Sequence, residues 1–130
     1  MKILLVEDNP GDARLIEEMI KEVEGPARFE LIHVKSLAEA LHSLSADSFD
    51  SVLLDLGLPD SSGLDTLVKV HTHAPDIPIV VLTGLADEAV SAEALRQGAH
   101  DYLVKGRVDS DVLVRSMRYA TQSKGGGRQT

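Results

Sequence analysis

The sequence predicts an α/β fold in which helices cover both faces of a parallel sheet. Five short apolar runs recur along the chain, and continuous runs of this kind are typical of strands buried on both faces. Between them lie segments of about 10–14 residues whose apolar side chains repeat with the period of a helix. Strands that alternate strictly with helices build parallel sheets, so these two observations together predict a sheet with helices on both sides.

The apolar runs give the positions of the strands. We expect strands at residues 2–6, 29–34, 51–54, 79–82 and 102–104. The first run has the sequence KILLV, the third SVLL and the fourth IVVL. The fifth is the shortest of the five.

Apolar stripes and end signals predict the first two helices. The first is expected over residues 11–23, followed by Gly25 and Pro26 as its end. Its stripe consists of Leu15, Ile16, Met19, Ile20 and Val23. Ser36 and Glu39 have the spacing of a capping box at the start of the second helix. The buried stripe of that helix is predicted to contain Leu37, Ala40, Leu41 and Leu44.

Three further helices complete the alternation. The third is expected over residues 63–73, with Leu64, Leu67 and Val68 on its apolar face. The fourth is expected over residues 87–97, with Gly98 where a left-handed residue stops a helix. Asp109 or Ser110 is expected to cap the last helix. The apolar residues of that helix are Val112, Leu113, Met117 and Ala120.

Composition excludes several classes of function. The chain has 130 residues, a length that fits one domain with a real core. Cysteine is absent, which rules out disulfides, thiol catalysis and metal sites with cysteine ligands. The net charge of −8 disfavours direct binding of nucleic acid. No apolar run approaches the roughly 20 residues of a membrane span.

The two ends of the chain carry further signals. The start, MKILLVEDNPGD, places an acidic pair where a signal peptide would continue its apolar stretch. We therefore expect a cytoplasmic protein. The last eight residues, SKGGGRQT, are rich in glycine, and we interpret residues 123–130 as a flexible tail or linker after a domain at 1–122.

Polar residues gather directly after the predicted strands. Glu7 and Asp8 follow the first strand, Asp55 the third, Thr83 the fourth and Lys105 the fifth. The carboxyl ends of parallel strands meet at one edge of the sheet, where ligands bind in open α/β folds. The topology therefore predicts three carboxylates, one hydroxyl and one ammonium at a common edge.

This group of side chains suits metal-assisted phosphoryl transfer. Clustered carboxylates repel one another, and a hard divalent cation relieves that repulsion. Ligands that are all oxygen favour magnesium, with manganese as the alternative, over zinc. A carboxylate beside a cation, a lysine and a threonine can act as a nucleophile while its neighbours neutralise the phosphoryl oxygens.

Four segments in this order resemble a known family. They are ILLVEDNP, SVLLDLGLPDSSGLD, VVLTG and GAHDYLVKG. With these gaps the chain resembles the receiver domain of two-component response regulators, similar to the single-domain chemotaxis receiver, over residues 1 to about 122. The resemblance implies a flavodoxin-like fold: a doubly wound sheet of five parallel strands in the order 2-1-3-4-5, with five helices.

The resemblance also implies a phosphoacceptor and its metal ligands. Asp55 matches the phosphoacceptor of the family. Asp8 is expected to bind Mg²⁺ directly, together with Asp55 and the backbone carbonyl of Gly57. Glu7 is expected to act through a metal-bound water.

Three more residues match positions with roles in the family. Lys105 is expected to pair with Asp55 at rest and with the phosphoryl group afterwards. Thr83 is expected to donate a hydrogen bond to a phosphoryl oxygen, and Tyr102 to rotate inward as Thr83 moves. The family usually has a proline after the lysine with a cis bond between them, whereas this chain has Gly106. A cis bond without proline costs about 2.5–4 kcal/mol, which favours a trans bond here.

The function implied is that of a phosphoacceptor in a two-component phosphorelay. A sensor histidine kinase or a phosphotransfer protein would supply the phosphoryl group to Asp55. The face formed by the fourth helix, the fifth strand and the fifth helix would then bind a downstream effector or a second copy of the chain. We expect a signalling domain rather than an enzyme. Such a domain catalyses only its own phosphorylation and dephosphorylation, and we expect this one to bind neither membrane nor nucleic acid directly.

Other functions fit the sequence less well. An aspartyl-nucleophile phosphohydrolase usually has a second Asp two residues after the first, where this chain has Gly57. A dinucleotide-binding domain needs a three-glycine fingerprint that the first turn, VEDNPGD, lacks. A receiver-like domain that only docks partners would not need the complete set of site residues.

Several other polar residues have simpler interpretations. Asp60, Asp65, Asp87 and Glu88 are interpreted as helix caps and solvated charges. The five histidines are scattered along the chain and do not predict a metal site. Gly63 is suited to a positive φ in the loop after Asp55.

Overall fold

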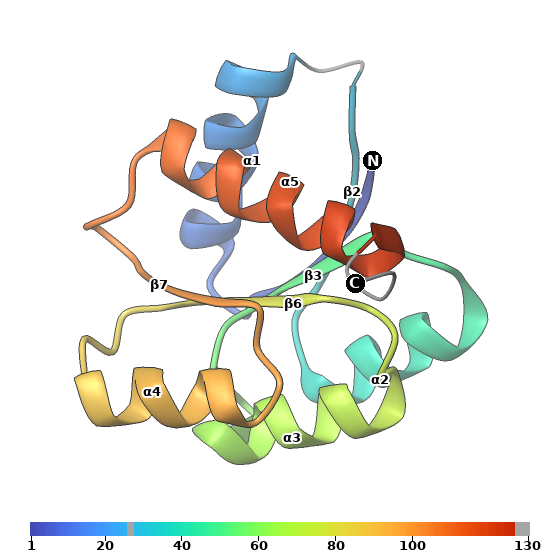
Figure 1. The fold of residues 1–130 in the computed structure, drawn as a ribbon, viewed down its shortest axis with the longest axis vertical. Coiled ribbons are helices and arrows are strands. Elements are labelled where there is room, and N and C mark those ends of the chain that lie inside the picture. The colour runs from blue at the N-terminus through green and yellow to red at the C-terminus, as the bar shows by residue number, and fades with distance from the viewer. Residues whose placement is uncertain (26–27, 127–130) are drawn as a thin grey trace.

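A five-stranded parallel sheet forms the centre of the molecule (Figure 1). The structure is a computed structural model, and it describes residues 1–25 and 28–126. In spatial order the strands are β2 (Glu30–Val34), β1 (Lys2–Val6), β3 (Ser51–Leu54), β6 (Ile79–Thr83) and β7 (Asp101–Val104). Counted along the chain, this order is 2-1-3-4-5, which confirms the predicted topology.

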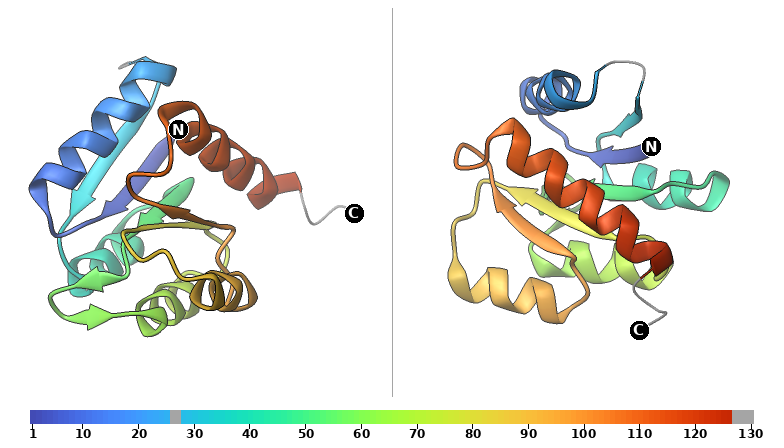
Figure 2. Two further views of the ribbon diagram at one scale, coloured as in Figure 1. Left: turned by 90° about the vertical axis from the view of Figure 1, so that its left-hand side faces the viewer. Right: turned by 45° about the horizontal axis from the view of Figure 1, so that its top comes forward.

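Five helices cover the two faces of this sheet. The helices α1 (Pro10–Glu24) and α5 (Ser110–Gly126) lie together on one face. The other face carries α2 (Leu37–Ala46), α3 (Leu64–His73) and α4 (Glu88–Arg96). The two further views in Figure 2 show the same division. The fold is therefore doubly wound, as predicted.

Each face of the sheet has its own apolar core. Beneath α1 and α5, the sheet contributes Ile3, Leu5, Leu53, Val80 and Leu82. Beneath the other three helices, it contributes Leu4, Val6, Val52, Leu54, Ile79 and Val81. Neighbouring residues of one strand thus enter opposite cores, because successive side chains of a strand point to opposite faces. This explains why the central strands are continuous apolar runs.

Side-chain caps begin the first two helices, and the cap of the second is the predicted one. The Asn9 carboxamide oxygen accepts a hydrogen bond from the Asp12 N–H at 3.0 Å. The Ser36 hydroxyl accepts one from the Glu39 N–H at 3.1 Å. The Glu39 carboxylate, however, accepts from the N–H of Lys35, 2.6 Å away. It therefore reaches one residue further back than in a standard capping box.

Aspartates cap two later helices. Asp87 Oδ1 accepts hydrogen bonds from the N–H groups of Ala89 and Val90. Asp109 Oδ1 accepts from the Val112 N–H at 2.8 Å, which assigns the cap of α5 to Asp109 rather than Ser110. The interpretation of Asp87 as a cap is confirmed.

Two glycines have the backbone conformation predicted for them. Gly63, directly before α3, has φ = +67°. Gly98, after the last turn of α4, has φ = +112°. A Cβ at Gly98 would lie only 2.8 Å from Nε2 of His71. This position therefore requires glycine for its conformation and for the close approach of α3.

Three apolar side chains assigned to buried stripes are exposed. Leu15 is 60% exposed on α1, and Val68 and Val112 are 37% and 38% exposed on α3 and α5. Each lies at the border of its stripe, where the helix surface turns away from the sheet. A periodic pattern defines the centre of a buried stripe better than its border.

Some element boundaries differ from those predicted. Strand β2 starts at Glu30, one residue later than expected, while β7 starts one residue earlier and β6 ends one residue later. A short antiparallel hairpin, β4 (Gly57–Leu58) and β5 (Ser61–Ser62), was not anticipated. Helix α5 continues to Gly126, past the predicted domain end at 122. Two parts of these predictions lie outside the described residues: Pro26, which was expected to end the first helix, and residues 127–130 of the predicted tail.

Candidate functional site

The carboxyl edge of the sheet brings the predicted charged residues together. Glu7 and Asp8 follow β1, Asp55 follows β3 and Lys105 follows β7. Carboxylate oxygens of Glu7, Asp8 and Asp55 all lie within 4.8 Å of one another. Because β1 and β3 are adjacent and in parallel register, the residues that follow them must emerge side by side.

The ammonium group of Lys105 lies among carboxylates. It donates to Asp55 Oδ2 at 3.1 Å, so the predicted pairing at rest is present. It also contacts Glu7 Oε1 at 2.5 Å and Asp12 Oδ2 at 3.0 Å. Burial lowers the pKa of Lys105, but the hydrogen bonds to Glu7, Asp12 and Asp55 outweigh this effect and raise the pKa above its ordinary value. Lys105 is therefore a permanent cation at this edge.

Glu7 is the most enclosed of the carboxylates, with 1% of its surface exposed. Its second oxygen accepts a hydrogen bond from the Asn9 N–H at 3.1 Å. Burial raises the pKa of Glu7, and the nearby charge of Asp55 adds to the rise, whereas the hydrogen bonds from Lys105 and Asn9 oppose it. The folded chain thus resists ionisation of Glu7 when no cation is bound.

The donor set at this edge fits magnesium. The three clustered carboxylates differ in access, since Asp8 is exposed while Glu7 and Asp55 are buried. Mg²⁺ is usually held by one or two carboxylates and keeps several waters. An exposed carboxylate beside a buried pair provides ligands on one side and open solvent on the other. Because all of these ligands are oxygen atoms, the site disfavours zinc.

Among the described residues, the side chains of Thr83 and Tyr102 make no hydrogen bond to the carboxylates or the ammonium of this cluster. Thr83 ends β6 and is 5% exposed, and its carbonyl accepts a hydrogen bond from the Lys105 N–H at 2.8 Å. The Tyr102 hydroxyl donates to the Leu85 carbonyl at 2.7 Å. Burial raises the pKa of Tyr102, with a smaller contribution from Asp87. The tyrosine thus points toward the loop before α4.

The backbone around Asp55 and Lys105 is held by local hydrogen bonds. The Gly57 N–H lies 3.3 Å from Asp55 Oδ1. The Asp55 N–H donates to the Val6 carbonyl at 3.0 Å. The bond between Lys105 and Gly106 is trans, as the absence of a proline favoured. Lys105 nevertheless reaches Asp55 across the sheet edge, so the glycine does not displace its ammonium from the site.

Asp60 lies further along the same loop and caps a different helix. Its two carboxylate oxygens accept from the N–H groups of Leu37 and Ala38, at 2.8 and 3.0 Å. These hydrogen bonds hold the pKa of Asp60 below its ordinary value. The interpretation of Asp60 as a cap is confirmed, although the helix it caps is α2, 22 and 23 residues earlier.

Asp12 is the residue at this edge that the sequence did not single out. It lies in the first turn of α1, where an acidic residue is favourable for the helix dipole whatever its further role. Its position in the sequence could have indicated this role, because Asp12 is four residues after Asp8 and lies on the side of α1 that faces the β7–α5 loop. A helix-terminal carboxylate of this kind is too common to be distinctive.

Comparison with known proteins identifies the family. A family model described as the response regulator receiver domain matches residues 3–118. The chain belongs to this family. Among solved structures, the receiver is similar to a CheY-like response regulator receiver domain protein from Methanospirillum hungatei JF-1, with a TM-score of 0.81 and 25% identity. That alignment covers 99% of this chain and 98% of the other.

Curated relatives of the receiver are longer regulators. The chain is 39% identical over 105 residues to the swarming motility regulation protein RssB of Serratia marcescens, covering 81% of this chain and 46% of RssB. It is 31% identical over 125 residues to the cell cycle transcriptional regulator CtrA of Caulobacter vibrioides, covering 96% and 52%. The receiver thus spans about half the length of these two relatives.

Across its described residues, no helix combines the length and the apolar character needed to cross a bilayer.

Proposed function

We propose that this receiver domain accepts a phosphoryl group on Asp55 in a step that depends on Mg²⁺. One observation carries the proposal: Asp55 lies within 4.8 Å of two further carboxylates and 3.1 Å from the Lys105 ammonium. A nucleophilic carboxylate needs nearby positive charge to approach a phosphoryl group, which is itself an anion. Lys105 supplies one such charge, and a dication at the acidic cluster would supply the other.

Asp8, Asp55 and the backbone carbonyl of Gly57 would hold Mg²⁺ directly, and Glu7 through a bound water; Mn²⁺ is the alternative ion. When bound, the ion neutralises charge on the phosphoryl oxygens. The pKa of Glu7, raised mainly by burial, supports this assignment, because a site that resists its own negative charge gains most from a cation.

In the transfer step, an Asp55 carboxylate oxygen forms a bond to phosphorus. The bond from phosphorus to the imidazole nitrogen of a phosphohistidine breaks, and the electron pair leaves with the imidazole, which takes a proton from solvent. Lys105 and the hydroxyl of Thr83 would hydrogen-bond the transferred group. Hydrolysis of the resulting acyl phosphate restores the Asp55 carboxylate. We propose that the chain is a signalling domain that catalyses only its own phosphorylation and dephosphorylation.

The output face is proposed to be α4, β7 and α5. Tyr102 lies on β7, and its hydroxyl is bound to the carbonyl of Leu85, whose own side chain is 48% exposed. Leu95 on α4 and Tyr119 on α5 are 48% and 57% exposed. A shift of Thr83 toward a phosphoryl group would free space for Tyr102 and alter this face. An effector or a second copy of the chain would bind there.

The partners upstream would be a sensor histidine kinase or a phosphotransfer protein. Because such donors act in the cytoplasm, we propose a cytoplasmic location. We further propose that residues 1–122 form the receiver unit and that residues 123–130 are a tail or a linker after it. The net charge of −8 supports protein partners rather than direct contact with nucleic acid or membrane.

Phosphorylation by acetyl phosphate tests this proposal. Wild-type chain with MgCl₂ is expected to gain one phosphoryl group by intact-mass spectrometry, and to gain none with EDTA. Asp55→Asn is expected to gain none, because the amide is not a nucleophile. Asp65→Asn is the matched control, since this aspartate pairs with Lys69 on the exposed side of α3. Phosphorylation of Asp55→Asn at the wild-type rate would overturn the proposal.

A further inference from the structure

Lys105 is shared among three carboxylates. Its ammonium has three N–H donors, and three carboxylates lie within hydrogen-bonding distance: Glu7 at 2.5 Å, Asp12 at 3.0 Å and Asp55 at 3.1 Å. Each donor therefore has a partner. The proposed reaction uses Glu7 and Asp55 but assigns nothing to Asp12.

Asp12 approaches Lys105 from another part of the fold. Glu7 and Asp55 follow strands of the sheet, whereas Asp12 lies on α1. Its backbone is fixed, because the Asp12 N–H donates to the Asn9 cap at 3.0 Å. Its side chain is 43% exposed, compared with 1% for Glu7 and 11% for Asp55. Asp12 thus has the most solvent-exposed side chain of the three carboxylates.

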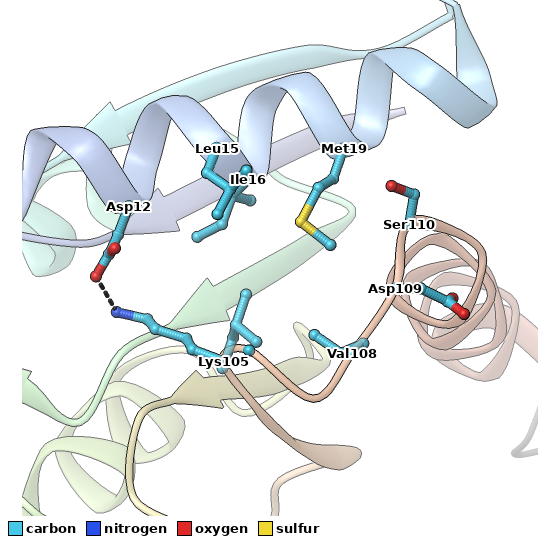
Figure 3. Close-up of a pocket in the computed structure, with 10 residues that line it drawn as sticks. Asp12, Leu15, Ile16, Met19, Lys105, Val108, Asp109 and Ser110 are labelled. Atoms are coloured by element: carbon cyan, nitrogen blue, oxygen red, sulfur yellow. Dashed lines mark hydrogen bonds and ion pairs between the residues drawn. The ribbon is translucent and has the colours of Figure 1, made fainter.

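Packing does not force Lys105 toward α1. A cavity of about 330 Å³ separates α1 from the β7–α5 loop, and Lys105 forms part of its wall (Figure 3). Leu15, Ile16 and Met19 line it from α1, with Val108 opposite. The ammonium bridges the mouth of this cavity to reach Asp12. Open space thus lies beside the lysine stem, and the contact that draws the ammonium toward α1 is its ion pair with Asp12, at 3.0 Å.

We propose that Asp12 is a positioning residue that restrains Lys105 and thereby weakens the capture of the phosphoryl anion. The inference rests on the proposed function. In the resting domain Asp12 takes one of the three lysine donors and lowers the net positive charge that the ammonium presents to Asp55. An incoming phosphoryl group must compete with Asp12 for the ammonium.

This role predicts opposite effects on two ligands. Removal of the Asp12 charge makes the site less negative, which favours an anion and disfavours a cation. Loss of a merely structural contact at the start of α1 would instead lower stability without separating the two affinities. The pair of affinities therefore distinguishes positioning of Lys105 from support of the helix.

The test uses the full chain and titration calorimetry with two probes. The first is Mg²⁺ alone, and the second is beryllofluoride at saturating Mg²⁺. The variants are Asp12→Asn, which removes the charge at nearly constant shape, and Asp12→Glu, which keeps it. Glu18→Gln is the control, because Glu18 is an exposed acid on the same helix that pairs with Lys21.

Asp12→Asn is expected to bind beryllofluoride about two- to five-fold more tightly, the scale set by partly exposed ion pairs. Its affinity for Mg²⁺ is expected to be lower. Asp12→Glu and Glu18→Gln should match wild type within two-fold in both titrations. In protein without Mg²⁺, nitrogen NMR of the Lys105 ammonium should show faster proton exchange in Asp12→Asn, because one partner is lost.

The outcomes separate the two proposals. If wild type does not bind beryllofluoride with Mg²⁺, the proposed function is overturned and this inference with it. If wild type binds but Asp12→Asn binds no more tightly, the inference alone is overturned. It is also overturned if Asp12→Asn tightens both ligands equally, or if the exchange of the Lys105 ammonium does not change.

Discussion

Two aspartates on the loop between β3 and α3 have opposite surroundings. Asp55 is buried and lies among other carboxylates, with the ammonium group of Lys105 as its cationic partner. Asp60, five residues later, is exposed and accepts hydrogen bonds from two fixed N–H groups at the start of α2. One carboxylate thus has neighbours of its own charge, and the other has only donors.

The difference separates a functional charge from a structural one. Backbone donors at a helix start stabilise a carboxylate and occupy its oxygens as acceptors, so that it serves the fold rather than a ligand. A carboxylate beside others of its kind reduces stability, but it can still bind a cation or react. The same residue type on one loop therefore contributes to folding at one position and to chemistry at another.

The largest expected effect follows from removing the shared cation. Lys105→Met leaves the buried Glu7 and Asp55 without their ammonium partner. In protein without Mg²⁺ we expect a loss of about 2–3 kcal/mol in the free energy of unfolding, below the value for fully buried pairs because Lys105 is partly exposed. Urea denaturation measures it, and added Mg²⁺ should recover part of the loss. Unaltered stability would mean that the ammonium does not offset the carboxylates.

Removal of the structural carboxylate should have a smaller effect on stability and none on chemistry. Asp60→Ala leaves two N–H groups at the start of α2 without acceptors, so thermal unfolding should begin a few degrees lower. Phosphorylation by acetyl phosphate should continue at close to the wild-type rate. Asp60→Asn, which retains one acceptor oxygen, should lose less. A variant as stable as wild type would show that the cap contributes nothing.

Removal of an exposed member of the acidic cluster should act in the opposite direction. Asp8→Asn relieves repulsion, so we expect stability without Mg²⁺ to rise by about 0.5 kcal/mol, a magnitude typical of exposed charge pairs. Wild type should be stabilised by Mg²⁺ in thermal melts, and Asp8→Asn much less. A variant that is destabilised without Mg²⁺ but retains the full response to the ion would contradict both parts.

The smallest effects concern pH. The pKa of Asp60 is lowered from 3.8, by its hydrogen bonds to Leu37 and Ala38, so its contribution to stability is present above that value and lost as pH falls through the folded pKa. The pKa of Glu7 is raised from 4.5, mainly by burial, so its contribution is present below that value and lost as pH rises through the folded pKa.

Two variants separate these contributions in denaturation curves without Mg²⁺. The deficit of Asp60→Asn should be full at neutral pH and should shrink below pH 3.8. Glu7→Gln should gain stability relative to wild type as pH rises above 4.5. Parallel pH profiles for wild type and both variants would refute the two assignments.

The sequence predicted a parallel sheet because its central strands are buried on both faces, whereas the strand order came from the resemblance to receiver domains. A run such as Ile3–Val6 has no solvent-facing side chain, so its apolar signal is continuous. Local capping was also predictable, as at Ser36, since a cap depends on residues three apart. The grouping of Glu7, Asp8 and Asp55 followed from topology alone.

What could not be predicted depends on contacts between distant segments. Nothing near Asp60 in the sequence indicates that it caps α2, because the partners lie 22 and 23 residues away. The third partner of Lys105, Asp12, is 93 residues from it. Pairings of this kind are set by tertiary packing rather than by local pattern.

The central place of β1 has a consequence for the order in which the chain can fold. β1 is translated first, yet it lies between β2 and β3. A nascent chain that has not yet reached Leu54 can pair β1 with β2 alone and leaves the other edge of β1 open. Such an apolar edge is a template for unwanted pairing. On the ribosome, this edge of β1 therefore stays open to such pairing until residues 51–54 emerge.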